Sequence, residues 1–185
     1  MSGGTVLETA RTRLGELVAD DAPFVLALLT SPSFLRHIGD RGVHDLDGAR
    51  RYIADSAQAS YARHGFGLWR ATRREDGAAI GLCGLLRRPE LPAPDLGFAF
   101  LETAQGQGYG RETAEAVLRH ARAALGIGRV LAIVAEGNVA SLAVLRHLGF
   151  ADAGEHAPGV RLLAHAGRPA DDAQRSRPPD CARPG

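Results

Sequence analysis

Three glycines within six residues form the clearest candidate site for chemistry in this chain. Residues 105–110 read Q-G-Q-G-Y-G, and they lie between an apolar segment at 95–101 and a helical pattern that begins at once. A helix start presents unpaired backbone N–H groups and the positive end of the helix dipole. Glycine lets such a backbone approach a ligand closely, because it has no Cβ. The stretch therefore predicts an anion site, most often one for phosphate, and its alternative is a plain glycine-rich turn.

The residues that follow the glycines exclude two common phosphate loops. A Walker loop needs Lys and then Ser or Thr after its last glycine, but Arg111 and Glu112 stand there. A dinucleotide-binding loop has the spacing G-x-G-x-x-G and an acidic residue about 20 positions later. Here the spacing is G-x-G-x-G, and the corresponding zone holds R-V-L at 129–131. The pattern that remains is Q-x-x-G-x-G.

A second motif lies one predicted strand further along the chain. Residues 136–150 read E-G-N-V-A-S-L-A-V-L-R-H-L-G-F, in which Asn138 is a natural helix N-cap and Gly149 a helix stop. With Q-x-x-G-x-G before it, this motif resembles the GCN5-related N-acetyltransferases (the GNAT family), which bind acetyl-CoA. The spacing N-x-x-S-x-x-x-L-x-x-L-G-F is similar to the branch that acetylates the N-termini of ribosomal proteins. The resemblance covers roughly residues 9–165.

The resemblance implies acetyl-CoA as the co-substrate and places it along the chain. The pantetheine arm would lie along residues 98–101, where a backbone N–H beside a strand bulge would polarise the thioester carbonyl. The pyrophosphate would rest on the amides of residues 105–111. The implied cofactor-binding residues are Phe98, Phe100, Leu101, Gln105, Gly106, Gln107, Gly108, Gly110, Arg111, Asn138 and Ser141. No His, Cys or Asp cluster has metal-ligand spacing, so no metal is expected.

The same resemblance implies three catalytic residues. Asp95, at the start of the central strand, would take the proton from the amine. Ser141 would protonate the departing thiolate, and Asn138 would contact the pantetheine arm. Each has a structural alternative: Asp95 ends a Pro-rich turn, Asn138 only caps its helix, and Ser141 bonds its own backbone. Many relatives carry a Tyr one turn after the Ser, where this chain has Leu145.

Other side chains that could carry chemistry have weaker support. Glu102 is a second candidate base, which we expect to face solvent. His37 and His44 lie in the segment that borders the acceptor in similar proteins, so the resemblance implies that they touch the substrate. His120 and His147 lie late in predicted helices, where they favour the helix dipole. The only cysteine within the predicted domain lies in an apolar strand and is expected in the core.

Composition bounds the function classes. The chain has 185 residues, of which 45% are hydrophobic, enough for one domain with a sizeable core. A net charge of +1 gives no electrostatic reason to expect nucleic acid or an acidic membrane as partner. We see no secretory signal, no apolar run near the roughly 20 residues of a membrane span, and too few cysteines for a disulfide framework. We therefore expect a cytoplasmic protein. All 22 basic residues are Arg, which suggests a GC-rich, bacterial genome and excludes lysine chemistry.

Apolar periodicity predicts the elements that position these residues. Strands are expected over residues 9–17, 66–72, 79–86, 95–101 and 129–135, the fourth and fifth parallel through a helical crossover. Phe150 enters a further strand, and residues 160–165 can supply the last one. Helices are expected from residue 20 or 21 to the Ser-Pro at 31–32, from 45 or 47 to about 63, from the glycine loop to 126, and from 138 to 149. Residues 33–44 are expected to be irregular, and Asp76-Gly77 marks a hairpin turn.

These expectations combine into one α/β domain over residues 1–165, with a mixed, mostly antiparallel central sheet flanked by helices, and a flexible Pro/Arg-rich tail over 166–185. The expected activity is direct transfer of an acetyl group from acetyl-CoA to a primary amine in a ternary complex, the acceptor being a protein N-terminal α-amine. Two alternatives remain open: a small-molecule amine or antibiotic as acceptor, and a non-catalytic acyl-CoA-binding module. The expected state is a monomer or homodimer that binds neither nucleic acid nor membrane.

Overall fold

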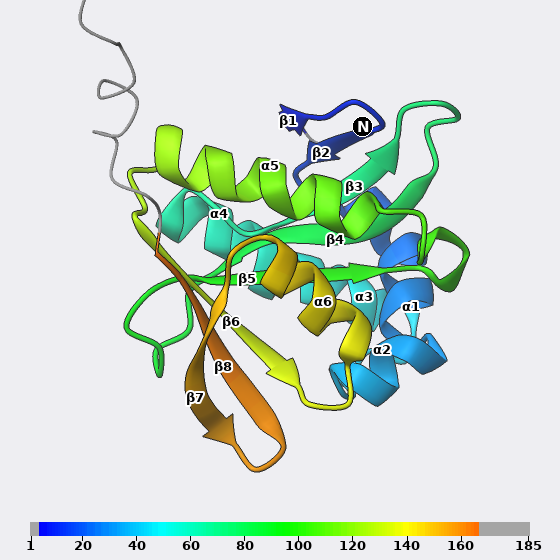
Figure 1. Cartoon of the computed structure of the whole chain (residues 1–185). Coiled ribbons are helices and arrows are strands. Elements are labelled where there is room, and N and C mark those ends of the chain that lie inside the picture. The colour runs from blue at the N-terminus through cyan, green and yellow to red at the C-terminus, as the bar shows by residue number, and fades with distance from the viewer. Residues whose placement is uncertain (1–3, 167–185) are drawn as a thin grey trace, which may run out of the picture.

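A computed structural model describes residues 4–166, which fold around one eight-stranded sheet (Figure 1). The strand order is β1-β2-β3-β4-β5-β6-β8-β7, and β5 and β6 are the only parallel neighbours in it. The strands are β1 (Thr5–Glu8), β2 (Thr12–Gly15), β3 (Leu68–Arg73), β4 (Ala79–Leu86), β5 (Asp95–Phe100), β6 (Arg129–Ala135), β7 (Ala151–Ala157) and β8 (Val160–Ala166). The mixed, mostly antiparallel sheet is confirmed.

Helices cover both faces of the sheet (Figure 1). They are α1 (Ala22–Leu29), α2 (Pro32–His37), α3 (Leu46–Tyr52), α4 (Ala59–His64), α5 (Tyr109–Ala123) and α6 (Val139–His147). Short 3-10 turns at Ala19–Asp21 and Glu102–Ala104 and a π-helical segment at Ile53–Gln58 complete the set.

The alternation of side chains along β4 explains the two layers of helices. Cys83 and Leu85 pack in the same cluster as α5 residues such as Val117, whereas Leu82 packs with α1 and α3 residues such as Leu28. Successive residues of a strand point to opposite faces, so an unbroken apolar run of this kind belongs to a strand buried on both sides. The sequence predicted β4 and β6 with the bounds that the structure has.

The parallel pair β5–β6 meets at one point and then separates. Their register contains a single pairing, Asp95 with Leu131, supported by a hydrogen bond from the Leu131 N–H to the Pro94 carbonyl at 2.9 Å. The β5 residues beyond Asp95 stay paired with β4 as far as Phe100. The β6-facing edge of β5 therefore lacks strand partners along most of its length, which leaves its backbone groups available to a ligand.

Two expectations near the N-terminus were wrong. The segment 9–17 is not one strand, because Thr9 turns the chain: its N–H donates to the Thr12 carbonyl at 2.8 Å, and β1 pairs with β2 as a hairpin. Residues 33–44 are not wholly irregular, because α2 begins at Pro32. The Ser31 hydroxyl accepts from the Phe34 N–H at 3.3 Å. A Ser-Pro pair ends one helix and caps the next equally well.

The end of the sheet holds both strands that were expected there. The strand that follows Phe150 is β7 and the expected strand over 160–165 is β8, and the two form a hairpin in which β8 lies between β6 and β7. The expected tail over 166–185 lies outside the described residues, apart from residue 166, which ends β8. None of the described helices combines the length and hydropathy that a membrane crossing would require.

Candidate active site

The glycine loop needs its first two glycines for backbone reasons. Gly106 and Gly108 have φ values of +73° and +82°, a region that residues with a Cβ rarely adopt. Gly108 is the N-cap of α5, and the Glu112 N–H donates to its carbonyl at 3.1 Å. The N–H groups of residues 109–111 precede that first helical bond, so they have no partner within the helix. Gly110 has no such constraint: a Cβ there would meet the nearest Phe100 ring carbon at an ordinary 3.6 Å.

Arg11, in the β1–β2 turn, braces this loop from outside. Its Nη1 donates to the Gln107 carbonyl at 2.9 Å, its Nε donates to Glu112 Oε2 at 2.6 Å, and its guanidinium lies 4.6 Å from the centre of the Tyr109 ring. Glu112 also accepts from the Thr9 hydroxyl at 2.6 Å. Burial acts to raise the pKa of Glu112, but the hydrogen bonds from Thr9 and Arg11 outweigh it and hold that pKa below its ordinary value. Glu112 therefore stays ionised and fixes the loop to the sheet edge.

Two glutamines shape the entry to the loop. Gln105 Nε2 donates to the Phe100 carbonyl at 2.8 Å and to Ser33 Oγ at 3.2 Å, so it ties the end of β5 to α2. Gln107 Nε2 donates to the Thr103 carbonyl at 2.7 Å. Their amides act on the protein itself, which leaves the backbone N–H groups as the anion-facing donors of the loop.

Two cavities meet beside β5. One, the loop cavity, has a volume of about 400 Å³ and is lined by the glycine loop, α2 and the start of α6. The other, the β5 cavity, has a volume of about 510 Å³ and extends along β5 to Asp95. Both are lined by Phe98, Asn138 and Ser141. All the expected cofactor-binding residues line the loop cavity except Leu101 and Gln107.

The backbone of Phe98 offers a hydrogen-bond donor where the cavities meet. The Leu101 N–H donates to the Ile80 carbonyl of β4 at 2.9 Å, and backbone groups alternate sides along a strand. The N–H groups of Phe98 and Phe100 therefore point away from β4, toward β6, which is no longer paired there. The pairing of β4 with β5 is continuous, so the separation of β5 from β6, and not a bulge against β4, exposes this edge.

The start of α6 supplies two polar groups at the same junction. Asn138 Oδ1 accepts from the Ser141 N–H at 3.1 Å, which confirms its capping role. Within residues 4–166 the Asn138 amide nitrogen and the Ser141 hydroxyl have no hydrogen-bond partner. The expected alternative, in which the Ser141 hydroxyl bonds its own backbone, is therefore not what the structure has. At the position where many relatives carry a Tyr, Leu145 is buried in the core.

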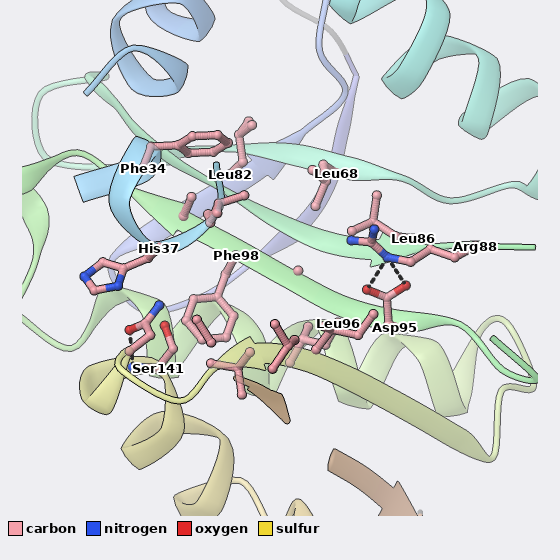
Figure 2. A pocket seen from close by; sticks show the side chains of 18 of the residues that line it. Phe34, His37, Leu68, Leu82, Leu86, Arg88, Asp95, Leu96, Phe98 and Ser141 are labelled. Atoms are coloured by element: carbon pink, nitrogen blue, oxygen red, sulfur yellow. Dashed lines mark hydrogen bonds and ion pairs between the residues drawn. The ribbon is translucent and has the colours of Figure 1, made fainter. Parts of the chain in front are cut away.

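Asp95 lies in the wall of the β5 cavity, paired with Arg88. Its two carboxylate oxygens accept from Arg88 Nε at 3.1 and 3.0 Å, and the residue is only 2% exposed. Burial raises the pKa of Asp95 above its ordinary value, although the positive charge of Arg88 opposes the shift. Figure 2 shows this pair at one end of the cavity and Ser141 with His37 at the other, with Phe98 between them.

The remaining candidate residues differ in whether they line a cavity. His37 lines both cavities, whereas His44 lines neither and lies 3.7 Å from Asp40 at the surface. Glu102 is exposed and lines neither cavity, as expected. Cys83 is fully buried, and burial raises the pKa of its thiol to about 12, so it is a core residue. No group of three or more His, Cys, Asp or Glu side chains between residues 4 and 166 is placed to hold a metal ion.

Several residues of the β5 cavity were not anticipated as site residues. They come from separate parts of the chain: Arg41 follows α2, Tyr52 ends α3, Arg88 lies in the Pro-rich loop and His156 is on β7. Tyr52 had a signal, since the helical periodicity placed it on an inward face. The others lie outside any periodic pattern, so only the fold brings them together.

Comparison with known proteins decides the family. Residues 11–151 match the family described as Acetyltransferase (GNAT) domain. The chain belongs to the GNAT acetyltransferase family. Two uncharacterized proteins of Bacillus subtilis are similar to it at 26% identity: YkkB, over 80% of this chain and 87% of the relative, and the N-acetyltransferase YoaA, over 78% and 82%.

Solved structures support the same family. An acetyltransferase from Agrobacterium tumefaciens superimposes on this GNAT chain with a TM-score of 0.76 at 26% identity, covering 89% of this chain and 95% of the other. A ribosomal-protein-S5-alanine acetyltransferase from Vibrio fischeri gives a TM-score of 0.67 at 15% identity, covering 88% and 96%. At that identity the second likeness shows a shared fold. The GNAT family uses acetyl-CoA as co-substrate, and the free N–H groups of the glycine loop fit its pyrophosphate.

Proposed function

We propose that this GNAT protein transfers the acetyl group of acetyl-CoA to a primary amine by direct attack within a ternary complex. One observation carries the proposal: the loop cavity and the β5 cavity meet at Phe98 and Ser141. A phosphate-bearing co-substrate in the first cavity and an amine in the second would bring their reacting ends to this junction. A module that only binds acyl-CoA has no need of the second cavity.

The co-substrate side would use backbone groups. The N–H groups of residues 109–111 would bind the pyrophosphate, and the pantetheine arm would follow the β6-facing edge of β5. The thioester carbonyl would then accept from the Phe98 N–H, which stabilises the charge that develops on that oxygen in the transition state. The amide nitrogen of Asn138 would donate to a carbonyl of the pantetheine arm.

Proton transfers would complete the reaction. The amine nitrogen attacks the thioester carbon, the carbon–sulfur bond breaks, and the amine loses one proton. Ser141 would give its hydroxyl proton to the departing thiolate and take one from a water in the same step, so that its hydroxyl ends the reaction unchanged. A thiol has an ordinary pKa of about 8.5, so the thiolate is a tolerable leaving group and the help that Ser141 gives is modest.

Asp95 would accept the amine proton, through water. Phe98 lies three positions after Asp95 on the strand, about 10 Å at roughly 3.3 Å per residue. Asp95 is therefore too far from an amine at the thioester to contact it directly. An α-amine has a pKa near 8, and roughly a tenth of it is free base at neutral pH. A weak base therefore suffices, and the raised pKa of Asp95 improves the match. His37, at the junction itself, is the rival base.

We propose an α-amine as the acceptor, on the motif around Asn138 and Ser141. Both a protein N-terminus and a small molecule such as an amino acid can supply an α-amine. The second candidate, a small-molecule amine, is favoured by one observation: the β5 cavity of about 510 Å³ ends in the Arg88–Asp95 pair, whose carboxylate is buried. We propose the cytoplasm as the compartment, on the sequence grounds given above.

The test is a turnover screen combined with a binding measurement. Calorimetry should show acetyl-CoA binding, and release of free CoA should rise when peptides with free N-termini, amino acids or aminoglycosides are added one class at a time. Mass spectrometry of the product should show one added acetyl group on the amine. Acetyl-CoA binding without turnover on any class of amine would leave a binding module as the better account.

A further inference from the structure

The lining of the β5 cavity carries more positive than negative charge. Its charged lining residues are Arg41, Arg88 and Asp95. Arg88 forms an ion pair with Asp95, whose two carboxylate oxygens share the single Nε–H of Arg88. Arg41 has no hydrogen bond or ion pair to any residue in the described part of the chain. The lining therefore has one cation more than it has anions.

The neighbours of Arg41 do not cancel that charge. The adjacent carboxylate, Asp40, accepts from the Gly42 N–H at 2.7 Å and lies 3.7 Å from the His44 ring. The half-buried Tyr52 lines the same cavity as Arg41 and Arg88. Burial raises the pKa of Tyr52, and the charge of Arg41, a hydrogen bond with Ser56 and the charge of Arg88 oppose the shift. Two cationic groups and one phenol hydroxyl thus line one cavity.

We infer that Arg41 and Tyr52 bind a carboxylate of the acceptor, so that the substrate class is an amine that also carries a carboxylate. A guanidinium and a phenol hydroxyl are both donors that match a carboxylate. The amine of such an acceptor would lie toward Phe98, and its carboxylate toward Arg41 and Tyr52. This inference rests on the proposed function and deepens it.

The same charges disfavour one of the acceptor classes considered above. A polycationic amine such as an aminoglycoside needs free carboxylates in its site. Among the described residues, Asp95 is the only carboxylate that lines the β5 cavity, and it is paired with Arg88. Placing a second cation beside Arg41 would add like-charge repulsion.

The experiment compares isosteric acids and amides. Initial rates would be measured for glutamate against glutamine amide and for aspartate against asparagine amide, because these diamides carry no carboxylate. The same residue pairs would be compared as the first residue of otherwise identical short peptides with amidated C-termini. We expect the acid of each effective pair to be preferred at least about tenfold in kcat/KM, the size of a charge-assisted hydrogen bond. The amino acid and peptide arms show which source of the chemistry the cavity accepts.

Variants assign the preference to the cavity. Arg41→Gln should abolish the preference by raising KM for the acids, with the Kd for acetyl-CoA unchanged. Arg36→Gln is the matched control, because Arg36 is an exposed arginine on α2 that lines neither cavity. Equal rates for acids and amides in the wild type, or a preference that survives Arg41→Gln, would overturn the inference.

A binding measurement separates this inference from the proposed function. Calorimetry with CoA present should show N-acetylglutamate or N-acetylaspartate binding at least about tenfold tighter than its diamide, which has no carboxylate, and Arg41→Gln should remove the difference. A carboxylate preference in binding without turnover would refute acetyl transfer alone. Turnover of neutral or cationic amines with no carboxylate preference would refute the carboxylate site alone.

Discussion

The two cavities that meet at Phe98 are built in different ways. The loop cavity owes its binding groups to backbone: two glycines at positive φ and the free N–H groups at the start of α5. The binding groups of the β5 cavity are side chains such as Arg41, Tyr52 and Arg88, which come from three separate segments of the chain. Backbone sites fix what is common to a family, whereas side-chain sites set what differs. We therefore expect substitutions in the loop cavity to change the Kd for acetyl-CoA, and substitutions in the β5 cavity to change kcat/KM for the acceptor.

The largest effect should come from a negative charge placed in the loop. Gly110→Glu should weaken acetyl-CoA binding at least 100-fold, because its carboxylate would stand beside the pyrophosphate in a partly desolvated site. Gly110 suits this test better than Gly108, where the positive φ and the Arg11 Nη2 at 3.3 Å would strain any side chain. Gly110→Gln is the control for bulk. If calorimetry gives the Glu and Gln variants equal affinities for acetyl-CoA, charge repulsion is not the cause of the loss.

At the other cavity, Asp95→Asn should lower kcat/KM by about 100-fold at neutral pH with acetyl-CoA affinity unchanged. A base must be ionised to act, and the pKa of Asp95 is raised, so the wild-type rate should fall as pH drops through a value above the ordinary carboxyl range. The Asp95→Asn variant should not show this fall in rate. The difference in kcat/KM between the wild type and the variant should narrow at high pH, where the amine is already deprotonated. Superimposable pH–rate profiles would transfer the role to His37, for which His37→Gln is the next variant.

Where the cavities meet, Ser141→Ala should lower kcat about tenfold with the Kd for acetyl-CoA unchanged. The helix cap should survive, because Asn138 accepts from the Ser141 N–H and not from its hydroxyl. Asn138→Ala is the contrasting variant: it removes the cap and should cost about 1 kcal/mol of stability. An unchanged kcat for Ser141→Ala, with chemistry shown to limit turnover, would leave Ser141 without a catalytic role.

The smallest effect should come from the brace behind the loop. Glu112→Gln should raise the Kd for acetyl-CoA a few-fold, because Arg11 would lose its partner while the loop backbone remained. The pKa of Glu112 is lowered in the fold, so its ionised form stabilises the protein above the unfolded pKa, and that stability is lost as pH falls through the folded value. The denaturation midpoint of Glu112→Gln should therefore lie below that of the wild type at pH 7 and converge with it at low pH. A constant difference at every pH would refute the ionic part of the brace.

The fold and the loop cavity could be predicted because their signals are local. The glycine spacing, the N-cap Asn138 and the apolar runs of β4 and β6 each lie within a few neighbouring residues. Other features depend on partners distant in sequence. The Arg11–Glu112 pair spans 101 positions, and no periodic signal announces it. The bounds of β7 and its pairing with β8 were not predicted for another reason. Every residue of β7 is exposed, so the strand has no apolar alternation to detect.

The residues of the β5 cavity could not be predicted as a site, because they too depend on partners distant in the sequence. Asp95 was identified from its position before the central strand, but its pairing with Arg88 depends on how the Pro-rich loop folds back. Arg41 follows α2 in a segment that was expected to be irregular, so nothing in the sequence directs it toward a cavity. Side chains that converge from several elements become a site only when the tertiary structure is known.

The central claim is that two ligands occupy the two cavities together and react directly. The most direct measurement is the initial rate over a matrix of acetyl-CoA and acceptor concentrations, with the best acceptor found by screening. The claim predicts double-reciprocal lines that intersect, one CoA released per acetylated amine, and no acetylated protein when the acceptor is left out. Parallel lines together with an acetyl group retained on the protein would show that the enzyme carries the acetyl group itself, and would contradict the account.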